Sequence, residues 1–82
     1  MRFKWIDWNR SHIARHGVSE REAEEVLTAS GSTHRVRRDG TVVTDGRTMS
    51  GRHLLVVWRE EDATDIFADL ESMVFVVTAY EV

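Results

Sequence analysis

Two histidines near the N-terminus are the first residues of this 82-residue sequence that are suited to chemistry. His12 and His16 are four positions apart, so on a helix both imidazoles lie on one face. Such a pair suits general acid or base work, because an imidazole titrates near neutral pH, and it also suits metal binding. A zinc helix of the H-E-x-x-H type, however, needs a glutamate where this chain has Ile13. The structural alternative is that His16 binds free carbonyls in the last helical turn.

Several kinds of enzyme chemistry are excluded by what the sequence lacks. It contains no cysteine, which removes disulfide frameworks, thiolate zinc sites and cysteine nucleophiles. It also has no G-x-S-x-G elbow, no phosphate-binding G-x-x-x-x-G-K-[ST] loop and no dinucleotide fingerprint. We therefore expect neither a cofactor nor a metal. Arginine, histidine and tyrosine side chains suffice for RNA cleavage in which the neighbouring 2′-hydroxyl is the nucleophile.

The charges are segregated along the chain, although the formal net charge is only −3. Residues 1–29 balance to zero, residues 30–58 carry +3 and residues 59–82 carry −6. The arginines of the middle segment form a phosphate-binding strip if they converge in space, and are otherwise solvated surface. A mildly acidic chain can thus still present a nucleic-acid surface. These arginines are Arg35, Arg37, Arg38, Arg47 and Arg52.

The N-terminal third predicts one short strand and two helices. Residues 2–6 alternate in the manner of a strand. Asp7 is a typical N-cap for a helix over residues 8–16. Ser19 and Glu22 have the spacing of a capping box, which opens a second helix. The buried stripe of that helix comprises Ala23, Val26 and Leu27.

The rest of the chain predicts a β-meander. Asp-Gly and Ser-Gly turns separate three strand-like segments at 33–38, 41–49 and 53–58. Residues 59–72 hold six acids and predict a solvated loop, and the apolar run 73–80 predicts a central strand. The order β-α-α-β-β-β-β predicts a single α+β domain over the whole chain, with both helices on one face of a mostly antiparallel sheet. We expect the core to join the helix stripe to Trp5, Ile13, Leu55, Val57 and Val77.

Three tryptophans are many for so short a chain. Trp5, Trp8 and Trp58 are more typical of core or rim packing than of base stacking, because a small core needs large apolar side chains. Trp58 stands at a strand end beside Arg59. We therefore expect Trp58, of the three, to face a ligand.

The sequence shows no sign of membrane insertion or export. No apolar run approaches the roughly 18 residues that a membrane helix requires. The polar N-terminus also lacks the apolar stretch of a secretory signal. We therefore expect a cytoplasmic protein that does not bind a membrane.

Short motifs follow one another in a specific order over most of the chain. The first half carries Arg15-His16-Gly17-Val18-Ser19 and then Glu22-Ala23. The second half carries Gly46-Arg47-Thr48-x-x-Gly51-Arg52, the apolar strand 54–57 and Val76-Val77-Thr78-Ala79. In this order the motifs resemble the BrnT family of toxins, whose hallmark is a K/R-H-G-V/I-S run leading into an E-A pair. The resemblance implies a RelE-like α+β fold.

The resemblance also implies a function and a partner. It implies the toxin of a type II toxin–antitoxin pair, a metal-independent endoribonuclease that inhibits translation by cleaving RNA. The implied partner is a small DNA-binding antitoxin of the ribbon-helix-helix type, whose complex with the toxin represses their operon.

On this reading we assign provisional roles to individual residues. Arg47 and Arg52 are predicted to bind the reacting phosphate, and His16 to act as base or acid. Tyr80, which stands where the family's closing strand has an arginine, is predicted to be the complementary proton donor. The residues predicted to bind RNA outside the catalytic group are Arg35, Arg37, Arg38 and Trp58.

A second hypothesis remains open. The chain could be a catalytically degenerate toxin-fold protein that binds a protein partner through its sheet and its acidic segment. An active ribonuclease should gather its arginines on one face, whereas a binding module can scatter them.

Overall fold

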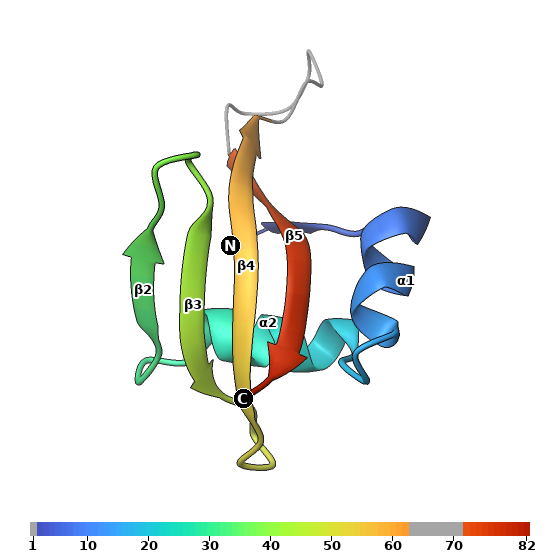
Figure 1. The fold of residues 1–82 in the computed structure, drawn as a ribbon, viewed down its shortest axis with the longest axis vertical. Coiled ribbons are helices and arrows are strands. Elements are labelled where there is room, and N and C mark those ends of the chain that lie inside the picture. Colours follow the sequence, from blue (N-terminus) through green and yellow to red (C-terminus); the bar gives the residue numbers. More distant parts are fainter. Residues whose placement is uncertain (1, 63–71) are drawn as a thin grey trace.

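The computed structural model describes residues 2–62 and 72–82, and this part of the chain has the predicted α+β architecture (Figure 1). Two helices precede a four-stranded meander, and a short strand begins the chain. The elements are β1 (Arg2–Lys4), α1 (Asp7–Ala14), α2 (Glu20–Thr28), β2 (Thr33–Val36), β3 (Val42–Arg47), β4 (His53–Asp62) and β5 (Ser72–Glu81).

The strands form one sheet in the order β1-β5-β4-β3-β2. Strands β2 to β5 pair antiparallel with their neighbours, whereas β1 pairs parallel with β5. The apolar strand β5 therefore has a neighbour on both sides, which confirms the predicted central position. Its two neighbours are β1, from the start of the described chain, and β4, which directly precedes it among the strands.

Helix α2 begins as the sequence predicts, whereas α1 does not. The Ser19 hydroxyl accepts from the Glu22 amide, and the Glu22 carboxylate accepts from the Ser19 amide, which completes the capping box. At α1 the predicted Asp7 cap is wrong, because Asp7 is already helical. The buried side chain of Asn9 instead accepts from the Ile6 amide over 2.8 Å. Neither described helix is long and apolar enough to cross a membrane.

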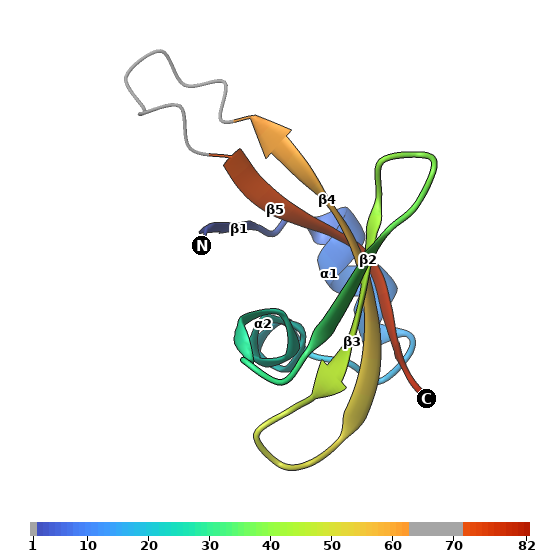
Figure 2. The same ribbon diagram turned by 90° about the vertical axis from the view of Figure 1, so that its left-hand side faces the viewer.

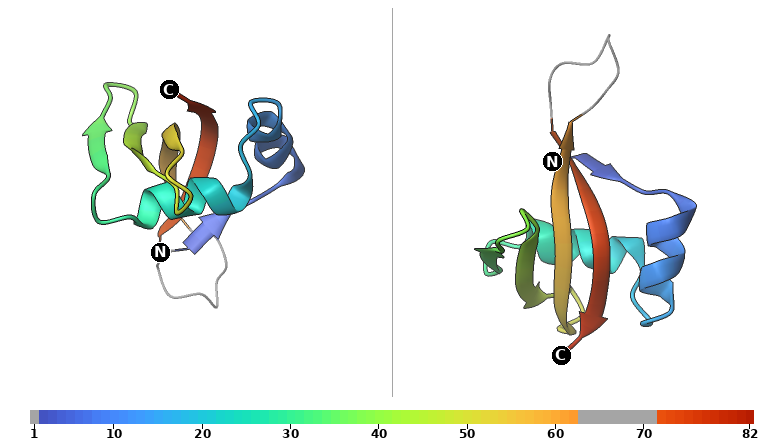
Figure 3. Two further views of the ribbon diagram at one scale, coloured as in Figure 1. Left: turned by 90° about the horizontal axis from the view of Figure 1, so that it is seen from below. Right: turned by 45° about the horizontal axis from the view of Figure 1, so that its top comes forward.

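Both helices contribute to one core on the same face of the sheet. Helix α2 crosses that face opposite β3 and β4, as the nearly edge-on view shows (Figure 2). Helix α1 packs along β5, just beyond the edge of the meander (Figure 3). The core residues are Ile13, Val18, Ala23, Val26 and Leu27 from the helical region and Leu54, Val56, Val74, Val76 and Ala79 from the sheet.

The predicted core is correct for the helices and only partly correct for the sheet. Trp5 packs against the core as expected. Leu55 and Val57 instead point to the opposite face, because side chains alternate along a strand and Leu54 and Val56 take the helix side. Val77 is the extra residue of a bulge, since Val57 pairs with Thr78 while Trp58 pairs with Val76.

The acidic segment is less loop-like than predicted. Residues 59–62 continue β4 and pair with the beginning of β5, and residues 63–71 lie outside the described part. Glu61 accepts hydrogen bonds from Arg59 over 2.8 Å and from Lys4 over 3.1 Å. These bonds, the one from Arg59 first, lower the pKa of Glu61. Ion pairs of Glu61 with Arg59 and with Lys4 of β1 thus accompany strand structure where the acid content alone predicts a loop.

Candidate functional site

The face of the sheet opposite α2 carries a shallow hollow, and no helix of the described chain covers it (Figure 1). The strand register brings Val43 beside Val57 and Leu55 beside Tyr80 on this face. These side chains form an apolar floor, on which Tyr80 remains 39% exposed. The rim is basic and comprises Arg35, Arg37 and Arg38.

The second feature of the hollow is that its three rim arginines are not held in ion pairs within the described part of the chain. None of the three forms an ion pair with another residue in the described ranges 2–62 and 72–82. The nearby Asp39 carboxylate is engaged by the hydroxyl and amide of Thr41, and these bonds lower the pKa of Asp39. The hollow therefore presents guanidinium groups that are not held in ion pairs within the described ranges, over an apolar floor. This combination is suited to an anionic ligand with flat apolar groups.

The predicted acid–base pair is brought together at the α1 side of this face. His16 lies in the turn after α1, and its ring centroid is 6.3 Å from that of Tyr80 on β5. The two ring planes are inclined by 57° to each other. Sequence reasoning thus identified two residues that the fold makes neighbours.

Arg52 connects the chain segments that carry this pair. Its Nη1 donates to the carbonyl of Gly17, directly after His16, over 2.8 Å. Its Nε donates to the carboxylate of Glu81, directly after Tyr80, over 3.2 Å. One guanidinium therefore holds both backbone segments in place.

Arg52 is also neutralised by its neighbours. Besides Glu81, it binds the carboxylate of Glu22 on α2 over 2.8 Å. That hydrogen bond is the main reason that the pKa of Glu22 is lowered, and the amide of Ser19 adds to the effect. With two carboxylates on one guanidinium, Arg52 is better suited to positioning the site than to binding phosphate directly.

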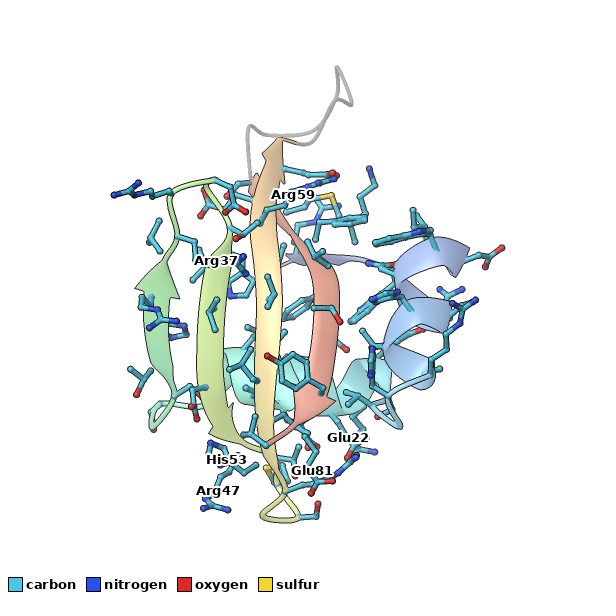
Figure 4. The ribbon with its side chains drawn as sticks, in the orientation of Figure 1. Glu22, Arg37, Arg47, His53, Arg59 and Glu81 are labelled. Atoms are coloured by element: carbon cyan, nitrogen blue, oxygen red, sulfur yellow. The ribbon has the colours of Figure 1, made fainter. Side chains whose placement is uncertain are left out.

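Arg47 lies apart from the His16–Tyr80 pair. It stands at the end of β3, where it donates to the carbonyl of Gly51 over 3.0 Å. It lines a second hollow together with Asp45 and His53, whose side chains are hydrogen-bonded to each other. Figure 4 shows Arg47 and His53 at one end of the sheet and Arg37 toward the other. The five arginines expected to converge are therefore divided between two ends of the sheet.

Trp58 does not face the candidate surface. It packs against the core on the helix side, and its indole Nε1 donates to the hydroxyl of Thr44 over 2.8 Å. Thr44 is fully buried and also contacts His34 Nδ1 over 2.7 Å. The expected ligand-facing position of Trp58 is therefore wrong, since strand alternation directs it to the same side as Leu54 and Val56.

Sequence reasoning overlooked an aromatic row beside the pair. Trp8 stacks with His12 at 5.3 Å between ring centroids, and His12 meets His16 at 5.7 Å. Phe75 on β5 stacks with Trp8 at 6.2 Å. Trp8, His12 and His16 follow one another at intervals of four residues, and this spacing indicated that their rings would be neighbours. No local pattern indicated that Phe75 would join them.

The row does not form a metal site in this structure. Within the described residues, no group of three or more His, Asp or Glu side chains is arranged to hold a metal ion. The rings of His12 and His16 meet edge to face, with 69° between their planes.

No protein-family model, curated protein or solved structure matches this chain. Its function must therefore follow from its own residues and their geometry.

Proposed function

We propose that the protein is a metal-independent endoribonuclease that cleaves RNA on the open face of its sheet. The observation that carries this proposal is the contact of His16 with Tyr80 at the border of the arginine-rimmed hollow. An imidazole and a phenol provide a base and an acid, and guanidinium groups bind phosphate. These groups suffice for a reaction whose nucleophile is supplied by the substrate.

The proposed reaction is an internal transfer at phosphorus. His16 takes the proton of the 2′-hydroxyl, and the freed oxygen attacks the adjacent phosphorus. The bond from phosphorus to the 5′-oxygen of the next nucleotide breaks, and Tyr80 donates its proton to that oxygen. The products are a 2′,3′-cyclic phosphate and a 5′-hydroxyl, so atoms and charge balance without a cofactor.

The arginines have different parts in this reaction. Arg35, Arg37 and Arg38 bind the RNA backbone through their unpaired guanidinium groups. Arg52 keeps His16 and Tyr80 in register through Gly17 and Glu81, and is a positioning residue. The role of binding the reacting phosphate, which the sequence assigns to Arg47 and Arg52, thus passes to the arginines of the β2 rim. Arg47 can bind another phosphate further along the RNA.

We further propose that the protein acts in the cytoplasm as the toxin of a type II toxin–antitoxin pair and inhibits translation. The order of its sequence motifs supports this, as does the exposed basic hollow. A DNA-binding antitoxin of the ribbon-helix-helix type would restrain it by laying acidic and apolar residues over the hollow.

Incubation of the purified protein with RNA in EDTA tests the catalytic proposal. We expect cleavage that leaves 2′,3′-cyclic ends, while a strand with 2′-deoxy sugars stays intact. Tyr80→Phe removes only the phenolic oxygen and should reduce the rate by about 10²-fold or more. Loss of cleavage in EDTA with recovery in zinc would overturn the metal-independent mechanism.

The alternative is a non-catalytic protein-binding module, and two observations favour it. The five arginines of the middle segment do not gather at one place, since Arg47 lines a different hollow from the arginines of the β2 rim. All four residues of the edge strand β2 are exposed, and Val36 is 73% exposed beside the apolar hollow. Such an edge can accept a strand from a partner. Intact RNA at high protein concentration, together with tight antitoxin binding, would decide for this alternative.

A further inference from the structure

Among the phenylalanine, tryptophan and tyrosine residues that the structure describes, Trp8 on α1 is the most exposed, at 55%. Its indole lies nearly parallel to His12 on the same helix, with 7° between the planes. It is also nearly parallel to Phe75 on β5, with 17° between the planes. Three flat rings from two elements thus form one stack along the seam where α1 meets β5.

This stack is continuous with the proposed catalytic pair. His12 contacts His16 at 5.7 Å between ring centroids, and His16 contacts Tyr80 at 6.3 Å. At the other side the guanidinium of Arg59 lies 4.6 Å from the Phe75 centroid and already covers that ring. Phe75 is only 6% exposed, so Trp8 offers a ligand far more open surface than Phe75 does.

The core does not require Trp8 to be where it is. The partly buried apolar residues that pack against the core are Phe3, Trp5 and Trp58, and Trp8 is not among them. The exposed half of the indole is apolar surface that a ligand can remove from water. Its parallel arrangement with two other rings is the geometry to which a nucleobase adds by stacking.

We propose that Trp8, together with the neighbouring rings of His12 and Phe75, is a base-stacking subsite for unpaired RNA beside the scissile phosphate. This inference rests on the proposed ribonuclease function and narrows its substrate to single strands. The phosphates follow the basic rim of Arg35 and Arg37, and a base next to the cleaved bond stacks on the row. Duplex RNA is excluded, because its bases are already stacked within the helix.

Binding of a 2′-O-methyl RNA oligonucleotide, which the enzyme cannot cleave, tests the subsite separately from catalysis. Trp8→Ala should weaken binding at least about fivefold, as expected for the loss of one base–aromatic stack. Trp8→Phe keeps a flat ring and should retain most of the affinity. Met49→Ala is the matched control, because Met49 is 87% exposed at the far turn and outside the row. Thermal unfolding of each variant shows that the fold is intact.

A strand with the same backbone but without bases completes the test. It should bind the wild-type protein about as weakly as the normal strand binds Trp8→Ala. Equal binding of both strands by the wild type, or equal affinity of Trp8→Ala and wild type, would overturn the subsite. Tight, base-dependent binding without any cleavage of ordinary RNA would instead retain the subsite and reject the ribonuclease proposal.

Discussion

Arg52, directly before β4, donates a hydrogen bond to Glu22 of α2 over 2.8 Å. The same guanidinium binds the carbonyl of Gly17 and the carboxylate of Glu81. It therefore joins helix α2, the turn after α1 and the end of β5 at one point. A substitution of Arg52 should therefore lower the stability of the fold and disturb the alignment of His16 with Tyr80.

Replacement of Arg52 by alanine should lower both thermal stability and RNA cleavage. The carboxylates of Glu22 and Glu81 lose their common partner. The turn that carries His16 loses the hydrogen bond from Arg52 to the carbonyl of Gly17. We expect kcat to fall more than KM rises, because the substrate phosphates bind elsewhere. Arg47→Ala is the control for stability only, because this change removes a single hydrogen bond, to the carbonyl of Gly51, and the variant should unfold at nearly the wild-type temperature. An Arg52→Ala variant with wild-type stability and no cleavage would argue for direct phosphate binding.

The lowered pKa of Glu22 predicts a pH dependence of stability. The folded state favours the charged carboxylate, so its contribution is complete above the ordinary pKa of 4.5 and is lost as pH falls through the lower folded value. Glu22→Gln cannot make this contribution at any pH. The difference in unfolding free energy between the two proteins, from urea titrations, should be largest near neutrality and should shrink as the pH falls below the ordinary pKa of 4.5. A difference that stays constant as the pH falls would show that the ion pair is not responsible.

The unpaired arginines of the rim should carry the electrostatic part of RNA binding. Arg37→Ala should weaken binding to all RNA sequences similarly and reduce the slope of log affinity against log salt by about one. Arg21→Ala removes the same charge from the outer side of α2, where Arg21 pairs with Glu25, and should leave the slope unchanged. Titrations at several salt concentrations measure both effects. The reverse pattern would place the RNA on the helix side.

Gly46 is required by close packing between β3 and α2. A Cβ atom at this position would overlap Ser32 Oγ, and it would lie 3.0 Å from Ser32 Cβ and 3.2 Å from Val26 Cγ1. Gly46→Ala should therefore reduce the unfolding free energy by about 1–3 kcal/mol, as overpacking does. Gly31→Ala, where nothing lies within 4 Å, is the matched control. Adding Ser32→Gly to Gly46→Ala should restore part of the lost unfolding free energy, as measured by urea unfolding. If the double variant recovers no stability, the overlap with Ser32 is not the cause of the loss.

The features that the sequence predicts well are those that depend on near neighbours. The Ser19–Glu22 capping box, the Asp-Gly and Ser-Gly turns and the order of the elements each rest on contacts a few residues apart. The sequence also names His16 and Tyr80 as an acid–base pair, but their approach depends on the packing of α1 against β5, which is a long-range contact. The parts of the fold that are visible in one dimension are therefore the locally determined ones.

The tertiary structure decided on which face each side chain lies and which partner it meets. Leu54 and Leu55 are chemically identical, and only strand pairing assigns one to the core and the other to the open face. Arg37 and Arg52 look alike in sequence, yet Arg52 alone meets carboxylates contributed by distant segments. Phe75 likewise reaches Trp8 only through packing of β5 against α1. Long-range contacts of this kind depend on the simultaneous placement of several elements, so local sequence patterns do not specify them.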